Sequence, residues 1–342
     1  MPTRVLVAGA GGFIGHHLVK YLVARGYWVR GADLKFPEYE TSPADEFEIL
    51  DLRRRDNCLV ATRGVDEVYH LAADMGGIGY ITYHHVDSAR NNILASTHML
   101  EASHTNGISR FFFSSSACVY PQFLQNVAEV TPLKEEDASP ADPDEGYGWE
   151  KLFTEKLCQY YAEDYGLETR VARFHNIYGP LGTYQGGREK APAAICRKVA
   201  LAADEGEIEL WGDGQQTRSF MYVRDCVEGV YRLMRSDYRK PLNLGTDRLV
   251  TIDQLVDIIS QIAGKVLTKR HNLEGPQGVR GRNSNNTRLR EVLGWEPDVS
   301  LEEGLTTTYR WIQSELLQGG ERGRPAAMAA QTVGHGPNRV AV

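Results

Sequence analysis

Two residues four positions apart, Tyr147 and Lys151, carry side chains that can act together on an alcohol. If their segment is helical, residues four apart lie on one face, so the phenol and the ammonium group are neighbours. A nearby positive charge favours the ionised phenol, so we expect a lowered pKa for Tyr147 and a role as base toward a hydroxyl. The pair alone is a common pattern, and its alternative interpretation is an incidental pair on a surface helix.

A run of aromatic and hydroxyl residues from Phe111 to Ser116 precedes this pair and is followed by Cys118. The run predicts a buried strand, and extended backbone through Cys118 would put Ser116 and Cys118 on the same face. A strand that ends in serine and precedes a Tyr–Lys helix has the order expected of a dehydrogenase. The context therefore favours a catalytic role for Ser116, Tyr147 and Lys151 over an incidental pair.

A glycine loop near the amino terminus, Gly9, Gly12 and Gly15, directly follows an apolar run and opens a helical pattern. Such a loop lets the backbone approach a pyrophosphate, and the helix N-terminus stabilises its charge. Asp33 ends the second predicted strand, close to the spacing of a carboxylate that holds an adenosine ribose. A carboxylate there repels the 2′-phosphate of NADP, so NAD is favoured, although Lys35 lies two residues on. The predicted cofactor contacts are Gly9, Gly12, Phe13, Ile14, Gly15, Asp33, Asp51 and Leu52 at the end of a third strand near the adenine, Tyr147 and Lys151.

Short apolar strands alternate with helical patterns in the first half of the chain. The predicted strands are 5–8, 27–33, 65–71 and 111–116, and the predicted helices include 14–25 and 92–105. Repeated strand–helix units imply an α/β, Rossmann-type doubly wound parallel sheet over residues 1–173. The irregular pattern of 174–317 predicts a smaller, interleaved α/β substrate lobe, with a strand near 241–245 returning to the sheet. Residues 318–342 lack periodicity and are predicted to be a disordered tail.

Composition and charge exclude several classes of protein. The formal net charge of -7 argues against nucleic acid as a partner, because phosphate binding needs a basic face. No apolar run reaches the roughly 20 residues that a membrane helix needs. The five cysteines are scattered without C-x-x-C spacing, so we expect no metal site and no disulfide framework. These features predict a cytoplasmic protein with reduced thiols.

The glycine loop and the Ser116–Tyr147–Lys151 set together resemble the extended short-chain dehydrogenase/reductase superfamily, in which these three positions form the catalytic triad. Longer segments resemble one of its families, the GDP-mannose 3,5-epimerases, from the first strand to about Trp311. The most specific of them are GREKAPAA at 187–194, QTRSF at 216–220 and VRGRNS at 279–284. The loop start Ala8-Gly9-Ala10 departs mildly from the common Thr-Gly-Gly.

The resemblance implies a mechanism. Tyr147 removes the proton of the C4 hydroxyl while NAD takes the C4 hydride, and the resulting 4-ketone acidifies the hydrogens at C3 and C5. Cys118 and Lys190 have the family's acid–base roles, one removing a proton and the other returning one on the opposite ring face. Reduction of C4 then restores NAD, which is expected to stay bound. The product is GDP-L-galactose.

The resemblance also implies a site for a GDP-hexose, with GDP-mannose as the expected substrate. Arginine forks suit a diphosphate, so Arg218, Arg280 and Arg282, with Lys198, are assigned to it. The glycine-rich segment 76–79 is expected to pass close to the hexose, where missing side chains leave room. The expected substrate contacts are Gly76, Gly77, Ile78, Ser116, Ala117, Cys118, Asn176, Glu189, Lys190, Ala191, Lys198, Gln216, Thr217, Arg218, Arg280, Arg282 and Ser284.

Several alternatives stay open at this point. A GDP-mannose 5-epimerase that gives GDP-L-gulose needs the same acid–base residues, and another nucleotide-sugar epimerase, dehydratase or decarboxylase could use the same scaffold. A non-catalytic NAD-binding regulator typically loses the tyrosine or the lysine, and both are present here. By analogy with the superfamily, whose members often pair through two helices each, we expect a homodimer.

Overall fold

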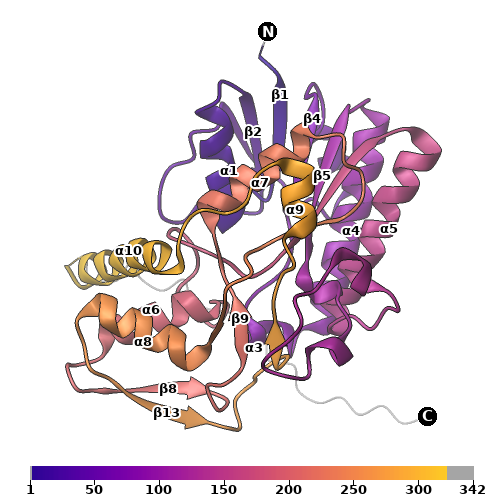
Figure 1. The fold of residues 1–342 in the computed structure, drawn as a ribbon. Coiled ribbons are helices and arrows are strands. Elements are labelled where there is room, and N and C mark those ends of the chain that lie inside the picture. Colours follow the sequence, from indigo (N-terminus) through magenta and orange to yellow (C-terminus); the bar gives the residue numbers. More distant parts are fainter. Residues whose placement is uncertain (1, 322–342) are drawn as a thin grey trace, which may run out of the picture.

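A parallel sheet of seven strands, in the order β11-β6-β5-β4-β1-β2-β3, forms the centre of the computed structural model, which describes residues 2–321 (Figure 1). This confirms the predicted Rossmann-type α/β fold. The strand order reverses between β1 and β4, and in such sheets ligands bind at the carboxyl ends of the strands beside this reversal. The strands of the sheet are β1 (Arg4–Ala8), β2 (Trp28–Asp33), β3 (Glu46–Ile49), β4 (Glu67–His70), β5 (Arg110–Ser116), β6 (Glu168–Phe174) and β11 (Leu242–Leu244).

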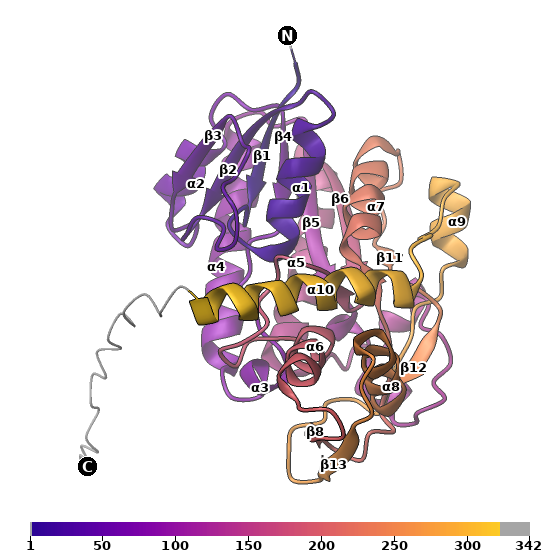
Figure 2. The same cartoon turned by 90° about the vertical axis from the view of Figure 1, so that its left-hand side faces the viewer.

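Helices cover both faces of the sheet (Figures 1 and 2). Alternate residues of β1 enter different cores: Val5 and Val7 pack with α1 and α7, whereas Leu6 and Ala8 pack with α2 and α4. Burial on both faces explains why β1 is a continuous apolar run. The covering helices are α1 (Phe13–Val23) and α7 (Val223–Arg235) on one face, and α2 (Arg55–Ala61), α4 (His85–Thr105) and α5 (Glu145–Tyr165) on the other.

A smaller lobe lies below the carboxyl ends of the strands, with α10 crossing between it and the sheet in Figure 2. Its core is formed by α6, α8 and α10 together with β8. The elements of this half of the chain are β7 (Ile177–Tyr178), α6 (Ala191–Leu201), β8 (Glu207–Trp211), β9 (Thr217–Ser219), β10 (Met221–Tyr222), β12 (Leu249–Thr251), α8 (Ile252–Ala263), β13 (Thr268–Asn272), β14 (Gly281–Arg282), α9 (Thr287–Leu293) and α10 (Leu301–Glu321). Short helical turns at Ile78–Ile81 (α3), Ala117–Val119, Gln122–Gln125 and Glu135–Ala138 complete the fold.

The two lobes share the second half of the chain. β11 pairs in parallel with β6, and α7 packs on the sheet beside α1. Elements of the expected segment 174–317 therefore contribute to the large sheet as well as to the smaller lobe, and the division at residue 173 stays a prediction. The expected tail begins too early, because α10 continues to Glu321. The rest of the predicted tail lies outside the described residues.

Some predicted boundaries are wrong for local reasons. The helix expected at 92–105 begins earlier, at His85. The prediction missed this start because the first two turns are polar and carry no apolar periodicity. The third strand ends at Ile49, so Asp51 and Leu52 follow it rather than end it. Within residues 2–321, no helix is long and apolar enough to cross a membrane. The same residues contain no group of three or more His, Cys, Asp or Glu side chains placed to hold a metal ion.

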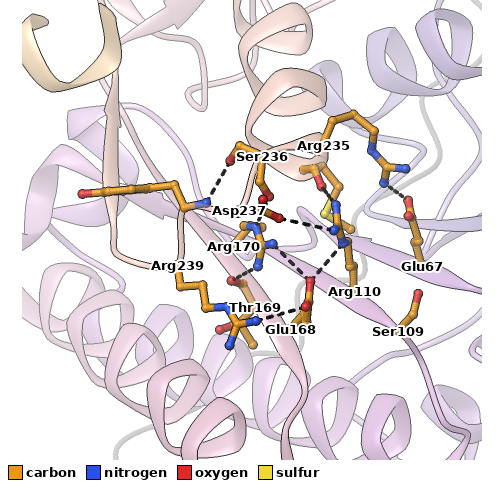
Figure 3. Close-up of polar contacts among 12 residues, drawn as sticks. Glu67, Ser109, Arg110, Glu168, Thr169, Arg170, Arg235, Ser236, Asp237 and Arg239 are labelled. Atoms are coloured by element: carbon orange, nitrogen blue, oxygen red, sulfur yellow. Dashed lines mark hydrogen bonds and ion pairs between the residues drawn. The ribbon is translucent and has the colours of Figure 1, made fainter. Parts of the chain in front are cut away.

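An ion-pair network at the amino ends of β5 and β6 ties the segment after α7 to the sheet (Figure 3). The Glu168 carboxylate accepts hydrogen bonds from Arg110, Arg170 and Arg239, each at 3.1 Å. Arg170 is fully buried, and it also donates to the backbone oxygen of Ser236 at 3.0 Å. Loss of the carboxylate would leave a buried guanidinium without its counter-charge.

We predict that Glu168→Gln lowers the free energy of unfolding by about 2 kcal/mol at pH 7, between the values of exposed and buried pairs. Burial raises the pKa of Glu168, but the charges of Arg170 and Arg110 hold it below its ordinary value. The carboxylate therefore stabilises the fold above its unfolded pKa, and this contribution is lost as the pH falls through the folded pKa. Urea unfolding of the variant, with the exposed Glu296→Gln as control, measures the difference. Equal midpoints for both variants would contradict the assignment.

Candidate functional site

A cavity of about 360 Å³ lies at the carboxyl ends of the strands, between the sheet and the smaller lobe. This volume is within the usual range for a small-molecule site. Its walls come from the loop after β4, the end of β5, the start of α6, the turn between β8 and β9, and the segment 276–282. Most of the predicted substrate contacts line it, namely Gly76, Gly77, Ile78, Ser116, Ala117, Cys118, Asn176, Glu189, Lys190, Ala191, Lys198, Gln216, Arg218 and Arg282.

Tyr147 and Lys151 both lie on α5 and are almost fully buried beside the cavity. The Lys151 Nζ is 5.3 Å from the centroid of the Tyr147 ring and 3.5 Å from the Glu150 carboxylate. The expected lowering of the Tyr147 pKa is wrong for the protein alone. Burial and the Glu150 charge raise this pKa well above its ordinary value, and a hydrogen bond with Ser116 opposes them. Glu150 neutralises part of the Lys151 charge, so the ammonium group does not dominate the phenol.

The backbone turns directly after Ser116 instead of staying extended. β5 ends at Ser116, whose hydroxyl accepts a hydrogen bond from the N–H of Cys118 at 3.1 Å, and residues 117–119 form a 3₁₀ turn. A shared strand face is therefore not what brings Ser116 and Cys118 together. The turn itself directs both residues to the cavity. A hydroxyl that caps the next turn competes with strand continuation, which the residue alternation does not reveal.

The turn also fixes the distance between Cys118 and the catalytic helix. A Cβ placed on Gly148 would lie 2.3 Å from the Cys118 carbonyl oxygen, so no other side chain fits there without displacing backbone. The same carbonyl accepts the N–H of Asp144 at 2.9 Å, one residue before α5 begins. Gly148 therefore lets the first turn of α5, which carries Tyr147, pack directly against the turn that carries Cys118. Tyr147 does not itself line the cavity but is hydrogen-bonded to Ser116, which does.

Arg282 lies against the thiol of Cys118. Its guanidinium donates to the Cys118 sulfur at 3.4 Å and to the Gln125 side chain at 2.6 Å, and it lies 3.5 Å from the Asp144 carboxylate. A guanidinium beside a thiol is a surrounding in which cysteines act as bases or nucleophiles. The geometry thus places Arg282 next to Cys118, and its expected contact with the diphosphate stays a prediction.

Lys190 is the residue before α6 and lines the cavity. Burial lowers the pKa of Lys190, and the charge of Cys118 acts in the opposite direction. A lysine with a lowered pKa can exchange a proton near neutral pH. Cys118 and Lys190 thus line the same cavity from elements of different lobes, as the expected acid–base roles require.

Arg218 provides the positive charge that an anion would need. Its guanidinium donates to the backbone oxygens of Thr217 and Val279, each at 2.7 Å, and within residues 2–321 no carboxylate is within ion-pair distance of it. Burial and the charge of Arg282 lower the pKa of Arg218 to about 9. Lys198 lines the same cavity, and its ammonium group donates to the Glu209 carbonyl at 2.6 Å. These two cations fit a diphosphate.

Three predicted substrate contacts lie outside the cavity lining. The Arg280 guanidinium pairs with Asp213 at 2.7 Å, the Thr217 hydroxyl donates to the carbonyl of Ala128, and the fully buried Ser284 donates to Asn286. The Thr217 side chain points away from the cavity, because successive residues of β9 point to opposite faces and its neighbour Arg218 faces the cavity. The resemblance identified the segments correctly but not the direction of each side chain.

The sequence interpretation missed other lining residues: Asp144, Arg197, Trp211 and the segment 276–279. Arg197 is the clearest omission, because its Nε is buried and has no hydrogen-bond partner. Arg197 lies next to Lys198 on α6, and its guanidinium is 3.6 Å from the Glu189 carboxylate. The assignment of Lys198 to the substrate was therefore the signal in the sequence that pointed to Arg197. Trp211 was visible within the quoted Trp-Gly-Asp-Gly segment.

The glycines of the segment 76–79 make room for protein as well as for a ligand. A Cβ on Gly77 would lie 2.3 Å from the Glu189 carbonyl oxygen, and one on Gly79 would lie 3.3 Å from the Trp211 ring. The expectation that missing side chains leave space for the hexose is thus incomplete. The absent side chains also allow this loop to contact the loop that carries Lys190.

The glycine loop after β1 has the geometry that a dinucleotide needs. Gly9 has φ +89°, and a Cβ on Gly15 would lie 2.0 Å from the Gly9 carbonyl oxygen, so the loop packs tightly at the start of α1. The face of Gly12 is open apart from one oxygen at 3.3 Å, which leaves a surface for a pyrophosphate. The Asp33 carboxylate accepts the Gly11 N–H at 2.9 Å and so fixes the loop at the ribose position.

Of the remaining predicted cofactor residues, Phe13 lines a second cavity of about 40 Å³ together with Gly12, and Ile14 packs against the core. Asp51 pairs with Arg53 at 2.8 Å, which leaves its carboxylate partly neutralised, and Leu52 is buried in the core. Lys35 lies 3.4 Å from the Glu38 carboxylate, which offsets part of its charge. The arrangement of the glycine loop and Asp33 fits NAD.

Comparisons with known proteins agree with this geometry. A family model described as the NAD dependent epimerase/dehydratase family matches residues 5–245. GDP-mannose 3,5-epimerase 1 of Oryza sativa subsp. japonica is 50% identical over 315 residues, which cover 92% of this chain and 82% of that protein.

Two solved structures show the same fold across both lobes. UDP-glucose 4-epimerase of Thermotoga maritima, with UDP-glucose, has a TM-score of 0.81 at 30% identity and covers 92% of this chain and 100% of that chain. UDP-glucose 4-epimerase of Thermus thermophilus, in complex with NAD, has a TM-score of 0.81 at 26% identity and covers 91% of this chain and 99% of that chain.

The lowered pKa of Lys190 predicts that this residue destabilises the folded protein. Lys190→Met should raise the thermal midpoint at pH 7 by roughly 1–3 °C while abolishing activity. The penalty of the buried ammonium is complete below the lowered pKa and disappears as the pH rises toward the ordinary value of 10.5. The stabilisation should therefore shrink between pH 7 and pH 10, as calorimetry can measure. The exposed Lys156→Met is the control, and a lower midpoint for Lys190→Met would contradict the prediction.

Proposed function

Since this chain belongs to the NAD dependent epimerase/dehydratase family, we propose that it is a GDP-mannose 3,5-epimerase that converts GDP-mannose to GDP-L-galactose. The observation that carries the proposal is that two sets of groups come together around one cavity: Ser116, Cys118 and Lys190 line it, and Tyr147 is hydrogen-bonded to Ser116. Ser116 and Tyr147 can act on an alcohol, and Cys118 and Lys190 can exchange protons with the neighbouring carbons. A 4-epimerase or a simple dehydrogenase needs only the first set.

The mechanism begins at C4 of the hexose. NAD, held by the glycine loop and Asp33, would supply the hydride acceptor for C4 and the hydride that restores the alcohol, and its nicotinamide ring would bring a positive charge to the site. Tyr147 accepts the C4 hydroxyl proton, and its hydrogen bond with Ser116 favours the phenolate against burial. The Lys151 ammonium lies 5.3 Å from the centroid of the phenol ring. Tyr147 keeps this proton in a buried position and returns it when C4 becomes an alcohol again.

Inversion takes place while C4 is a ketone. The ketone makes the hydrogens on C5 and C3 acidic, so a thiolate or an amine can remove them as protons. Cys118 and Lys190 lie on different lobes at the same cavity, as removal from one ring face and return on the other requires. Arg282, 3.4 Å from the Cys118 sulfur, stabilises the thiolate form between the two transfers.

The substrate is held by its diphosphate. Arg218 and Lys198 supply charge at the cavity, and Arg197 offers a buried N–H without a partner. A bound diphosphate would satisfy these groups and neutralise the guanidinium of Arg218, whose positive charge the nearby Arg282 disfavours. Asn176, whose left-handed backbone has φ 47°, lines the same cavity and is assigned to the sugar or the diphosphate.

Incubation of the protein with GDP-mannose in deuterated water tests this function. We predict deuterium at C5 and C3, with none at C4, because the C4 hydride never exchanges with solvent. Tyr147→Phe should lower the incorporation rate at least about 10²-fold, because no group then accepts the hydroxyl proton. NMR of the recovered nucleotide sugar identifies the labelled carbons. Label at C5 alone would reduce the function to a 5-epimerase that gives GDP-L-gulose, and no label at either carbon would reject the proposal.

A homodimer is the second part of the proposal. Trp149, Phe153 and Tyr160 lie on α5 and are each about half exposed, at 53%, 51% and 52%. Their spacing puts them on one side of the helix, and α4 packs directly beside α5 on the outer face of the sheet (Figure 1). An exposed aromatic stripe on paired helices fits a second copy of this chain, with α4 and α5 of each subunit in the interface.

The dimer predicts a specific change in mass. Trp149→Glu combined with Phe153→Glu should give a monomer by light scattering at micromolar concentration, because charges replace the apolar centre of the interface. The control Val266→Glu changes an apolar residue that is 77% exposed on the smaller lobe and should leave a dimer. A monomeric unsubstituted protein would contradict this part of the proposal.

The five cysteines are free and buried, which supports the further proposal of a reducing, cytoplasmic setting.

A further inference from the structure

The loop that carries Lys190 is attached to the other lobe through the side chain of Arg188. The Arg188 guanidinium lies 3.2 Å from the Asp74 carboxylate, in the loop after β4. The same guanidinium lies over the Tyr80 ring, 3.8 Å from its centroid. The Tyr80 hydroxyl donates to Asp74 at 2.8 Å, so ring and carboxylate form one receptor for the arginine. None of these three residues lines the cavity described above.

The receptor for Arg188 is built from the catalytic lobe. The Asn91 side chain donates to the Asp74 carboxylate at 2.9 Å, and the Asn92 side chain accepts the Asp74 N–H at 2.6 Å. Burial would raise the pKa of Asp74, but the hydrogen bonds from Asn91 and Tyr80 and the Arg188 charge hold it below its ordinary value. Asn92 also donates at 2.9 Å to Glu150, the partner of Lys151. The receptor is therefore fixed to the same elements that hold the Tyr–Lys pair.

Backbone contacts continue the attachment toward Lys190. The N–H of Gly77 donates to the Arg188 carbonyl at 3.0 Å, and the Glu189 carbonyl occupies the space where a Gly77 side chain would be. Before this point Gly186 and Gly187 have φ +92° and +87° with open space at their Cβ positions, and the Gly187 N–H donates only within the loop, to the Glu189 carboxylate at 2.7 Å. Lys190 is followed directly by α6, so the Arg188 side chain and the Gly77 N–H attach the residues just before Lys190 to the other lobe.

We propose that Arg188 is a positioning residue, which through Asp74 and Tyr80 holds Lys190 at the distance from Cys118 that proton return requires. The proposal rests on the proposed function. Arg188 acts on the proton-transfer half of the reaction, because Ser116, Tyr147 and Lys151 lie on β5 and α5 and not on this loop. Oxidation at C4 should therefore persist without Arg188 while inversion slows.

The expected sizes of the effects on stability and on rate distinguish positioning of Lys190 from stabilisation of the fold. The Arg188 side chain is 49% exposed, so its ion pair contributes little to the stability of the fold. A displacement of about 1 Å in a reacting group, in contrast, costs roughly 100-fold in rate. A variant at Arg188 should consequently lose turnover without losing its unfolding midpoint, which a residue with a purely structural role would not do.

The test compares Arg188→Gln with Arg248→Gln. Arg248 is equally exposed, at 49%, and its ion pair with Glu302 is outside the site. For Arg188→Gln we expect kcat for deuterium incorporation from deuterated water to fall roughly 10- to 100-fold, with KM within about threefold. The steady-state absorbance of reduced NAD at 340 nm should rise, because the ketone, which forms together with reduced NAD, would form faster than it is inverted. Arg248→Gln should match the unsubstituted protein in all three measurements.

Two further variants check the partners. Asp74→Asn should reproduce the Arg188→Gln effect, and the double variant should be no worse than either, since both remove the same contact. Arg188→Lys should recover part of the rate, because it keeps the charge for Asp74 but loses the planar contact with Tyr80. Turnover of Arg188→Gln equal to that of the unsubstituted protein, or a loss without any rise at 340 nm, would overturn the proposal.

Hydrogen exchange separates this proposal from the function on which it rests. Amides of the segment 76–84 should exchange faster in Arg188→Gln than in the unsubstituted protein or Arg248→Gln, because the Gly77 N–H loses a fixed acceptor. Unsubstituted protein that labels no carbon of GDP-mannose would reject the function, and the exchange rates would still decide whether Arg188 fixes the loop. Unchanged exchange in this segment would overturn the positioning role by itself.

Discussion

The turn after β5 and the first turn of α5 pack so closely that a hydrogen atom is all that Gly148 can present to the Cys118 carbonyl oxygen. This backbone contact joins two chemistries that are separate in the chain. In the proposed mechanism, the phenol of Tyr147 on one side acts on the C4 hydroxyl, and the thiol of Cys118 on the other acts on the neighbouring carbons. A larger residue at position 148 would displace the backbone that joins them.

Charge is distributed in the cavity according to the same division. Beside the Cys118 sulfur, Arg282 is paired with Asp144, and Lys151 is paired with Glu150. These cations are partly neutralised. Within residues 2–321, Arg218 is hydrogen-bonded to backbone carbonyls and to no carboxylate, so its charge is open to an anion. The proposed binding mode puts the diphosphate at Arg218 and the hexose toward Cys118.

Features of the sequence that depend on local pattern predicted much of this structure. The apolar strands, the glycine loop with Asp33 and the i,i+4 pair on α5 all follow from periodicity and spacing, and the resemblance added Cys118 and Lys190. Side-chain direction in short or irregular segments could not be read in this way. Thr217, Arg280 and Ser284 lie in matching segments but bind protein groups, and the Ser116 hydroxyl ends its strand early. The Tyr147 pKa depends on Glu150 and on burial, which require the folded protein.

Separation of C4 oxidation from inversion is the central claim, and Cys118→Ala tests it most directly. A single turnover of this variant with GDP-mannose, followed at 340 nm and stopped for NMR in deuterated water, measures both halves of the reaction at once. We predict that the absorbance of reduced NAD at 340 nm rises at the rate of the unsubstituted protein and that no deuterium appears at C5. Deuterium at C5 at an unchanged rate, or loss of the absorbance change with a folded variant, would contradict it.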